Sequence, residues 1–151
     1  RPGTAEREAR TQHERETELV GKLLGIAEGN AAGIDQEKIA LLPGVEIVAL
    51  CDFEEPRAAK LNETLRKHGL APAAIYSGAK GYEALCSRND IDLVYIATDW
   101  EHHAVVARCA LEHGKNVADE VPSAMNLEEC WQLVNLAEQK QLNCMILENC
   151  C

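Results

Sequence analysis

The sequence has 151 residues, 46% of them hydrophobic, and a formal net charge of -10 at pH 7. A chain of this length fits one domain with its own core, and its acidity argues against a nucleic-acid partner, because phosphate contacts need clustered Lys and Arg. No apolar run reaches the roughly 18 to 20 residues that cross a bilayer. We therefore expect neither a membrane partner nor an export signal, and favour a cytoplasmic location.

The first predicted segment is charged. Residues 1–18 mix Arg and Glu with almost no large apolar side chains, so they bury too little surface to offset the entropy lost on ordering. We expect a charged tail or an exposed helix over residues 1–18, and one folded domain over residues 19–151.

From residue 20 onward, short apolar runs alternate with amphipathic segments. Strands are predicted over residues 20–27, 45–51, 74–76, 91–98, 116–119 and 143–147. Helices are predicted over residues 31–42, 54–68, 82–86, 101–113 and 127–139. Runs such as VEIVALC and IDLVYIA are nearly continuous β-formers, which is typical of parallel strands covered on both faces. The pattern predicts an α/β fold, a doubly wound (Rossmann) parallel sheet of about six strands with helices on both faces.

Helix ends and helix faces are also predicted. Gly69 and Gly114 follow helical patterns, at the position where a left-handed residue ends a helix. Asn126 is a good N-cap for the helix after it. One face of that helix is expected to pack on the sheet, through Leu127, Cys130, Trp131, Val134 and Ala137.

The seven cysteines form no CxxC pair and have no regular metal-ligand spacing. We interpret them as reduced core thiols rather than as a zinc site or a disulfide framework. Adjacent histidines on a helix point in different directions, so zinc binding through His102, His103 and His113 is not expected. No metal site is predicted.

The loop after the first strand, AEGNAAG, leads into a helix whose free N-terminal N–H groups suit a pyrophosphate. Matched to the pattern G-x-G-x-x-G, Gly29 fits, whereas Ala27 and Ala32 stand in the outer glycine positions. Glycine-rich and alanine-rich turns are common, so this loop alone leaves a cofactor loop and an ordinary turn equally open.

Asp52 follows the second strand. It stands close to the interval of about 20 residues beyond the glycine loop at which a carboxylate accepts hydrogen bonds from an adenosine ribose. The nearest Arg, Arg57, lies a helical turn away, which favours NAD over NADP. Capping of the helix that starts at Glu54 is the alternative role, and the two roles are compatible.

The segment Thr98-Asp99-Trp100-Glu101-His102-His103 follows the fourth strand. One interpretation is a wall of a nicotinamide pocket, with Trp100 stacking and His102 or His103 donating to ribose or diphosphate. The other is a helix start with Asp99 as N-cap and solvated histidines. Glu120 and Val121 after the fifth strand, and Asn149 after the sixth, would face the same crevice; a capping role is the alternative for Glu120.

The stretches VEIVALCD, RNDIDLVYIATDWEHH and HGKNVADEVPSAMNLEECWQLVNLAE resemble the cofactor domain of the Gfo/Idh/MocA-type oxidoreductase superfamily. Glu120-Val121-Pro122 stands where most dehydrogenases of that superfamily carry Glu-Lys-Pro. Together with Trp100-Glu101-His102-His103, it resembles the NAD-dependent alpha-N-acetylgalactosaminidases of glycoside hydrolase family 109. In that branch, the resemblance implies, NAD transiently oxidises the sugar C3 hydroxyl, the aglycone is eliminated, water adds, and the hydride returns.

The motif and the resemblance together predict one set of contacts to NAD. They are Gly29, Asn30, Ala31, Asp52, Trp100, Glu101, His102, His103, Glu120, Val121 and Asn149. The substrate and acid-base residues of the family belong to a second domain expected after Cys151. We therefore predict no catalytic residue, cofactor binding as the function of this chain alone, and a carbohydrate partner only where that domain is present; homo-oligomer formation is left open. The alternative is a non-catalytic Rossmann remnant or interaction module that has lost the cofactor, because Cβ atoms at positions 27 and 32 crowd the diphosphate path.

Overall fold

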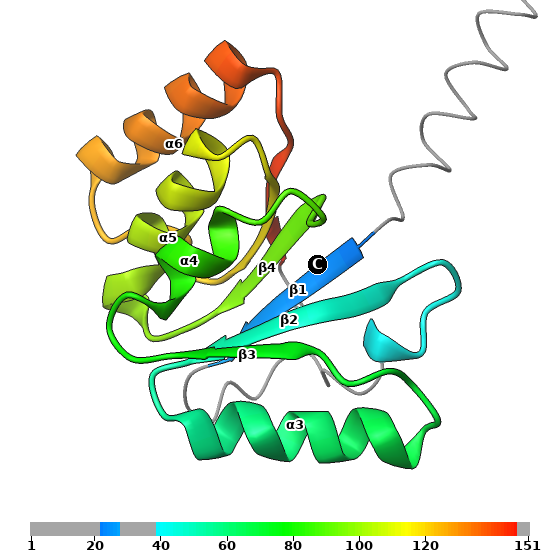
Figure 1. The fold of residues 1–151 in the computed structure, drawn as a ribbon. Helices are drawn as coiled ribbons and strands as arrows, with labels where there is room; N and C mark the ends of the chain where they lie inside the picture. Colours follow the sequence, from blue (N-terminus) through cyan, green and yellow to red (C-terminus); the bar gives the residue numbers. More distant parts are fainter. Residues whose placement is uncertain (1–21, 28–38, 148–151) are drawn as a thin grey trace, which may run out of the picture.

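A computed structural model describes residues 22–27 and 39–147 of the chain. It contains a six-stranded sheet of order β3-β2-β1-β4-β5-β6 (Figure 1), and every strand pairs with its neighbours in parallel. The strands are β1 (Lys22–Ala27), β2 (Glu46–Asp52), β3 (Ala74–Ser77), β4 (Leu93–Ala97), β5 (Asn116–Glu120) and β6 (Cys144–Leu147). The chain order reverses between β1 and β4, which makes this pair the switch point of a doubly wound sheet.

Helices cover both faces of the sheet, as predicted. They are α3 (Glu55–Lys67), α4 (Gly81–Cys86), α5 (Trp100–Glu112) and α6 (Leu127–Lys140). Figure 1 shows α3 on one side of the sheet and the other three helices on the opposite side. The alternation of β2 explains this: Leu50 packs with Ala58 and Leu65 of α3, whereas Ala49 and Cys51 belong to the core under α4 and α5. Successive side chains of a strand point to opposite faces, so one strand feeds two cores.

Two helices end at the glycines that predicted their ends. Gly69 and Gly114 have φ angles of 73° and 75°. The N–H of the residue after each glycine reaches back five positions along the helix end, with Leu70 N donating to Leu65 O at 3.0 Å and Lys115 N to Ala110 O at 2.9 Å. This bond completes the usual left-handed helix end. The predicted cap of α6 is also confirmed, since the side chain of Asn126 accepts from Glu129 N.

The predicted packing face of α6 is confirmed at Ala137 and wrong at its other four residues. Leu127 is 71% exposed and Trp131 is 56% exposed, and the residues that α6 buries are Leu133 and Ala137. The helix carries two apolar stripes, and it packs against α5 and the terminal strand β6 rather than across the broad centre of the sheet. A helix in that position buries only a narrow stripe, and the stripe through Leu133 and Ala137 faces inward.

The cysteine prediction holds in part. Cys51, Cys86 and Cys109 are buried, Cys144 is half-buried, and Cys130 is exposed on α6; none of these five described cysteines forms a disulfide. Within residues 22–27 and 39–147, no group of three or more His, Cys, Asp or Glu side chains is placed to hold a metal ion.

No helix in the described part of the chain combines the length and apolar character needed to cross a membrane.

Candidate functional site

The carboxyl ends of the strands bring distant residues together. Residue Ala27 at the end of β1 pairs with Ala97 at the end of β4, Ile96 pairs with Asp119, and Glu120 pairs with Leu147. The carboxyl ends of β1, β2, β4, β5 and β6 therefore lie along one edge of the sheet, which we call the carboxyl edge. Open α/β sheets bind ligands outside this edge, at the switch point.

Most of the predicted contacts that the structure describes come from this edge. Asp52 ends β2, Trp100, Glu101 and His102 open α5, and Glu120 and Val121 stand at the end of β5. Gly29, Asn30, Ala31 and Asn149 lie outside the described residues.

Asp52 is 2% exposed, and its Oδ1 accepts a hydrogen bond from Glu54 N at 2.8 Å. This bond holds the turn into α3, whose N-cap residue, Glu54, makes no side-chain cap bond of its own. Burial raises the pKa of Asp52, opposed by the Glu54 N–H and the charge of Arg57. The carboxylate therefore has a structural role in the turn, and it stands at the end of β2 where a ribose hydroxyl would be recognised.

The start of α5 has the predicted N-cap. Asp99 is the N-cap: its Oδ1 accepts from His102 N at 3.1 Å and lies 2.6 Å from His102 Nδ1. Trp100, the next residue, is 63% exposed. Glu101 is exposed in the first turn, where a carboxylate is favoured by the helix dipole. A capped helix thus presents an exposed indole beside the switch point.

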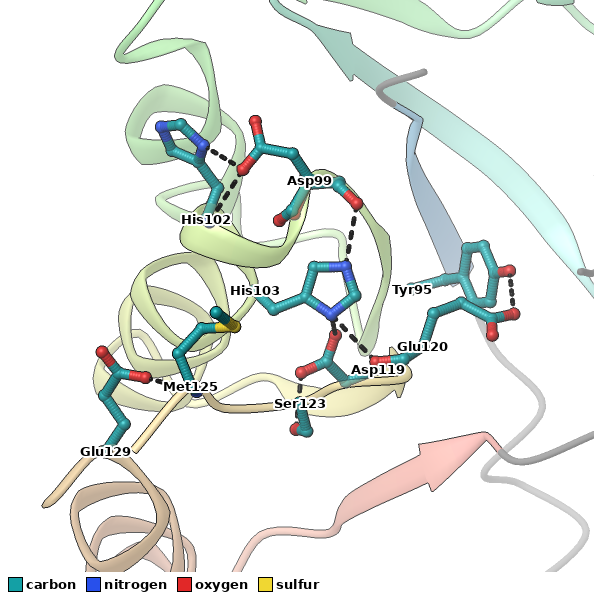
Figure 2. A network of polar contacts seen from close by, with 10 residues as sticks. Tyr95, Asp99, His102, His103, Asp119, Glu120, Ser123, Met125 and Glu129 are labelled. Atoms are coloured by element: carbon teal, nitrogen blue, oxygen red, sulfur yellow. Dashed lines mark hydrogen bonds and ion pairs between the residues drawn. The ribbon is translucent and has the colours of Figure 1, made fainter. Parts of the chain in front are cut away.

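His103 is buried, in contrast to its neighbour His102. Its side chain is 1% exposed, with Nδ1 2.8 Å from the backbone oxygen of Glu120 and Nε2 2.9 Å from that of Thr98. Figure 2 shows both ends of the ring engaged in this way. The prediction that this ring donates to ribose or diphosphate is wrong, because neither nitrogen is left for a ligand. Helix periodicity was the available signal, since His103 shares the inward face of α5 with Ala107 and Ala110.

Glu120 is held by a tyrosine that the sequence reasoning missed. The Tyr95 hydroxyl donates to Glu120 Oε1 at 2.8 Å, and Tyr95 is 3% exposed (Figure 2). Burial and the bond to Glu120 raise the pKa of Tyr95 well above its ordinary value. The phenol therefore stays protonated and donates, which fixes the direction of the Glu120 carboxylate.

Exposed apolar side chains follow three strands at the carboxyl edge. Phe53 after β2 is 58% exposed, Trp100 after β4 is 63% exposed, and Val121 and Met125 after β5 are 43% and 54% exposed. Single exposed apolar side chains are common, whereas a contiguous apolar patch marks a binding surface. Flat apolar surfaces of this kind suit the planar rings of a dinucleotide. Phe53 and Met125 were not among the predicted contacts.

Comparison with known proteins also indicates a dinucleotide-binding domain. Residues 11–148 match the model of the GFO_IDH_MocA family, described as an oxidoreductase family with an NAD-binding Rossmann fold. A glycosyl hydrolase family 109 protein of Phocaeicola vulgatus is 64% identical over 115 residues, which are 76% of this chain and 22% of the relative. An alpha-N-acetylgalactosaminidase of Bacteroides fragilis is 45% identical over 130 residues, 86% of this chain and 31% of the relative. The chain thus spans less than a third of the length of these two relatives.

Solved structures share the fold. Biliverdin reductase from Synechocystis, solved with biliverdin and NADP+, has a TM-score of 0.67 at 25% identity, with 84% of this chain and 37% of that chain covered. The 3-ketoreductase KijD10 from Actinomadura kijaniata, solved with NADP, has a TM-score of 0.68 at 24% identity, with 83% of this chain and 36% of that chain covered.

Proposed function

The chain belongs to the Gfo/Idh/MocA oxidoreductase family, of which it is the NAD-binding Rossmann domain, and from this premise we propose that NAD binds along the carboxyl edge beside β1 and β4. The observation that carries the proposal is the meeting of Asp52, the exposed start of α5, and Glu120 at one edge of the sheet. When bound, NAD supplies a hydride acceptor; the residues of this chain bind and orient it.

Asp52 is proposed to accept hydrogen bonds from the adenosine ribose. A buried carboxylate at this point repels a 2′-phosphate. Arg57, the nearest arginine in the sequence, is paired with Glu54, with its Nε 3.3 Å from Glu54 Oε2. A phosphate on the ribose would therefore meet a negative charge without a paired arginine. This arrangement favours NAD over NADP.

The other half of the cofactor is proposed to lie against α5 and the end of β5. Trp100 supplies a face for stacking, and Glu101 and His102 stand on the same exposed turn. Glu120 and Val121 lie beside this turn, and Tyr95 orients the carboxylate of Glu120. The ring of His103 is excluded from direct contact, and its role is to position the backbone at this edge.

A titration calorimetry experiment with NAD and NADP tests the cofactor proposal. We expect heat of binding with NAD below about 1 mM, and affinity for NADP at least about tenfold weaker, which corresponds to about 1.4 kcal/mol. Equal affinity would remove Asp52 as the discriminating carboxylate. No heat with either nucleotide would support instead a Rossmann module that has lost its cofactor.

For a longer protein that contains this domain, we propose glycosidase chemistry on N-acetylgalactosaminides. The support is the 45% to 64% identity to the two relatives named above. Because the domain is less than a third of those proteins, we expect this chain with added NAD to leave an aryl N-acetylgalactosaminide unhydrolysed. Turnover by the chain alone would contradict that expectation.

A further inference from the structure

Both ring nitrogens of His103 face oxygens that only accept hydrogen bonds. Nδ1 lies 2.8 Å from Glu120 O and Nε2 lies 2.9 Å from Thr98 O. A neutral imidazole carries one N–H, so one nitrogen would place its lone pair against a carbonyl lone pair. Two N–H groups satisfy both contacts, and they require the imidazolium.

A countercharge for the imidazolium lies next to the ring. Asp119 Oδ1 lies 3.0 Å from His103 Nδ1, and the two side chains are 0% and 1% exposed. The Ser123 hydroxyl donates to the other oxygen, Oδ2, at 2.6 Å. Among the described buried side chains, Asp119 Oδ1 is the polar atom without a hydrogen bond. Next to a neutral ring it would be a buried oxygen without compensation, which is costly, whereas the imidazolium charge compensates it.

The geometry points to His103 and Asp119 as positioning residues of the cofactor site: we propose that a buried imidazolium–carboxylate pair locks the ends of β4 and β5 in the form that binds NAD. This inference rests on the proposed function. Thr98 directly follows β4, Glu120 ends β5, and Ser123 lies in the loop beyond it (Figure 2). Loss of one ring proton would release one of the two carbonyls and leave Asp119 uncompensated.

The groups around the ring favour its protonated form. Burial alone lowers the pKa of His103, but the adjacent Asp119 carboxylate and the two carbonyls outweigh burial and raise it. Among the residues that the structure describes, the other titratable groups near the pair are Glu120 with its partner Tyr95 of β4, Asp99 and His102 at the start of α5, and Cys144 of β6 beside Asp119.

Nuclear magnetic resonance of the full chain, labelled with 15N in its histidines, tests the protonation directly. At about pH 7.5, where an ordinary histidine is neutral, we expect both His103 ring nitrogens to be protonated. The midpoint of its titration should lie above the ordinary histidine value of about 6.5. The backbone amides of Glu120 and Val121 should shift with the same midpoint. A single protonated nitrogen at this pH, or a midpoint at or below about 6.5, would overturn the proposal.

Calorimetry across pH tests the link to the cofactor. We expect NAD affinity to fall at least about tenfold between about pH 7 and pH 10 as the ring deprotonates. The double variant His103→Leu/Asp119→Leu removes both charges and leaves neither unpaired; we expect it to fold, to bind NAD at least about tenfold more weakly at neutral pH, and to lack this pH dependence. Wild-type affinity in that variant would refute the positioning role.

A control variant and the histidine ring signals distinguish failure of this proposal from failure of the proposed NAD site. Glu63→Gln, on the exposed side of α3, should keep the wild-type affinity and the wild-type pH profile. Absence of NAD binding at every pH would refute the proposed function and the positioning role with it, whereas the ring signals would still decide the protonation of His103.

Discussion

The carboxylate of Asp52 accepts a hydrogen bond within the turn into α3, and it lies where a ligand hydroxyl would also donate to it. Oδ1 accepts Glu54 N at 2.8 Å. Asp52→Asn keeps an oxygen for that bond and removes the charge that a ribose hydroxyl would meet. We therefore expect this variant to lose at least about tenfold in NAD affinity, since a hydrogen bond to a charged group is worth about 1.5–3 kcal/mol.

Calorimetry and thermal unfolding of the same preparations measure this prediction. Asp52→Asn should change the free energy of unfolding by less than about 1 kcal/mol, because the turn bond survives. The exposed Glu63→Gln serves as the matched loss of a carboxylate. Unchanged NAD affinity in Asp52→Asn would remove Asp52 from the site.

The raised pKa of His103 also predicts how the free energy of unfolding depends on pH. The pKa of His103 is raised in the folded chain. Its contribution to the free energy of unfolding is therefore fully present below the unfolded pKa of about 6.5, and it is lost as pH rises through the folded pKa. Urea unfolding of the wild type should therefore show a free energy of unfolding that declines across this alkaline window.

Cys109 titrates in part of this window with the opposite sign, because the neighbouring Cys86 thiol lowers its pKa to about 7. The comparison that isolates His103 is the difference between the wild type and His103→Leu/Asp119→Leu, in which Cys109 is common to both proteins. That difference should shrink as pH rises; a difference independent of pH would contradict the buried imidazolium. Removal of one partner alone, as in His103→Ala, is expected to cost about 3–5 kcal/mol.

At the scale of elements, α4 begins in tight contact with the sheet. A Cβ atom added at Gly81 would lie 2.9 Å from Cys51 Sγ and 3.3 Å from the backbone carbon of Tyr76. Gly81→Ala should therefore destabilise the chain by about 1–3 kcal/mol through overpacking. Chemical denaturation measures the loss.

The double variant Gly81→Ala/Cys51→Ala identifies the cause. Removal of Sγ vacates the closer contact, so the cost of Gly81→Ala should be smaller in the Cys51→Ala background than in the wild type. Equal costs in the two backgrounds would assign the loss to the backbone of Tyr76 instead.

The positions of most elements could be predicted from the sequence, because they depend on local signals. Apolar runs marked the strands, and Gly69, Gly114 and Asn126 marked helix ends through backbone conformations that few residues adopt or cap. The buried face of α6 could not be chosen in this way, because the helix has two apolar stripes. Only its packing on α5 and β6 decides between them.

The sequence predicted which edge of the sheet carries the candidate site, but not the contacts that side chains of the chain make with one another there. Strand ends place Asp52, Trp100 and Glu120 on one side of a parallel sheet by topology alone. The bond from Tyr95 to Glu120 and the burial of His103 against Asp119 join β4, α5 and β5 across the fold. Such contacts depend on register and helix rotation, which a single sequence does not specify.

For the whole molecule, the strand order and the helical layers determine where a ligand can reach the sheet. Helices lie on both faces (Figure 1), and the chain order reverses between β1 and β4. The carboxyl edge therefore carries the loops from both halves of the fold. The central claim is that NAD binds at this edge.

The chain has two tryptophans, and they test this claim within one experiment. Trp100 stands at the carboxyl edge, and Trp131 lies on the outward face of α6; they are 63% and 56% exposed. Similar exposure makes Trp131 an internal control. We therefore propose to follow the two indole N–H resonances of the 15N-labelled chain during titration with NAD. The account predicts a saturable shift of the Trp100 signal and a stationary Trp131 signal; a shift of Trp131 alone, or no shift of Trp100 at saturating NAD, would contradict it.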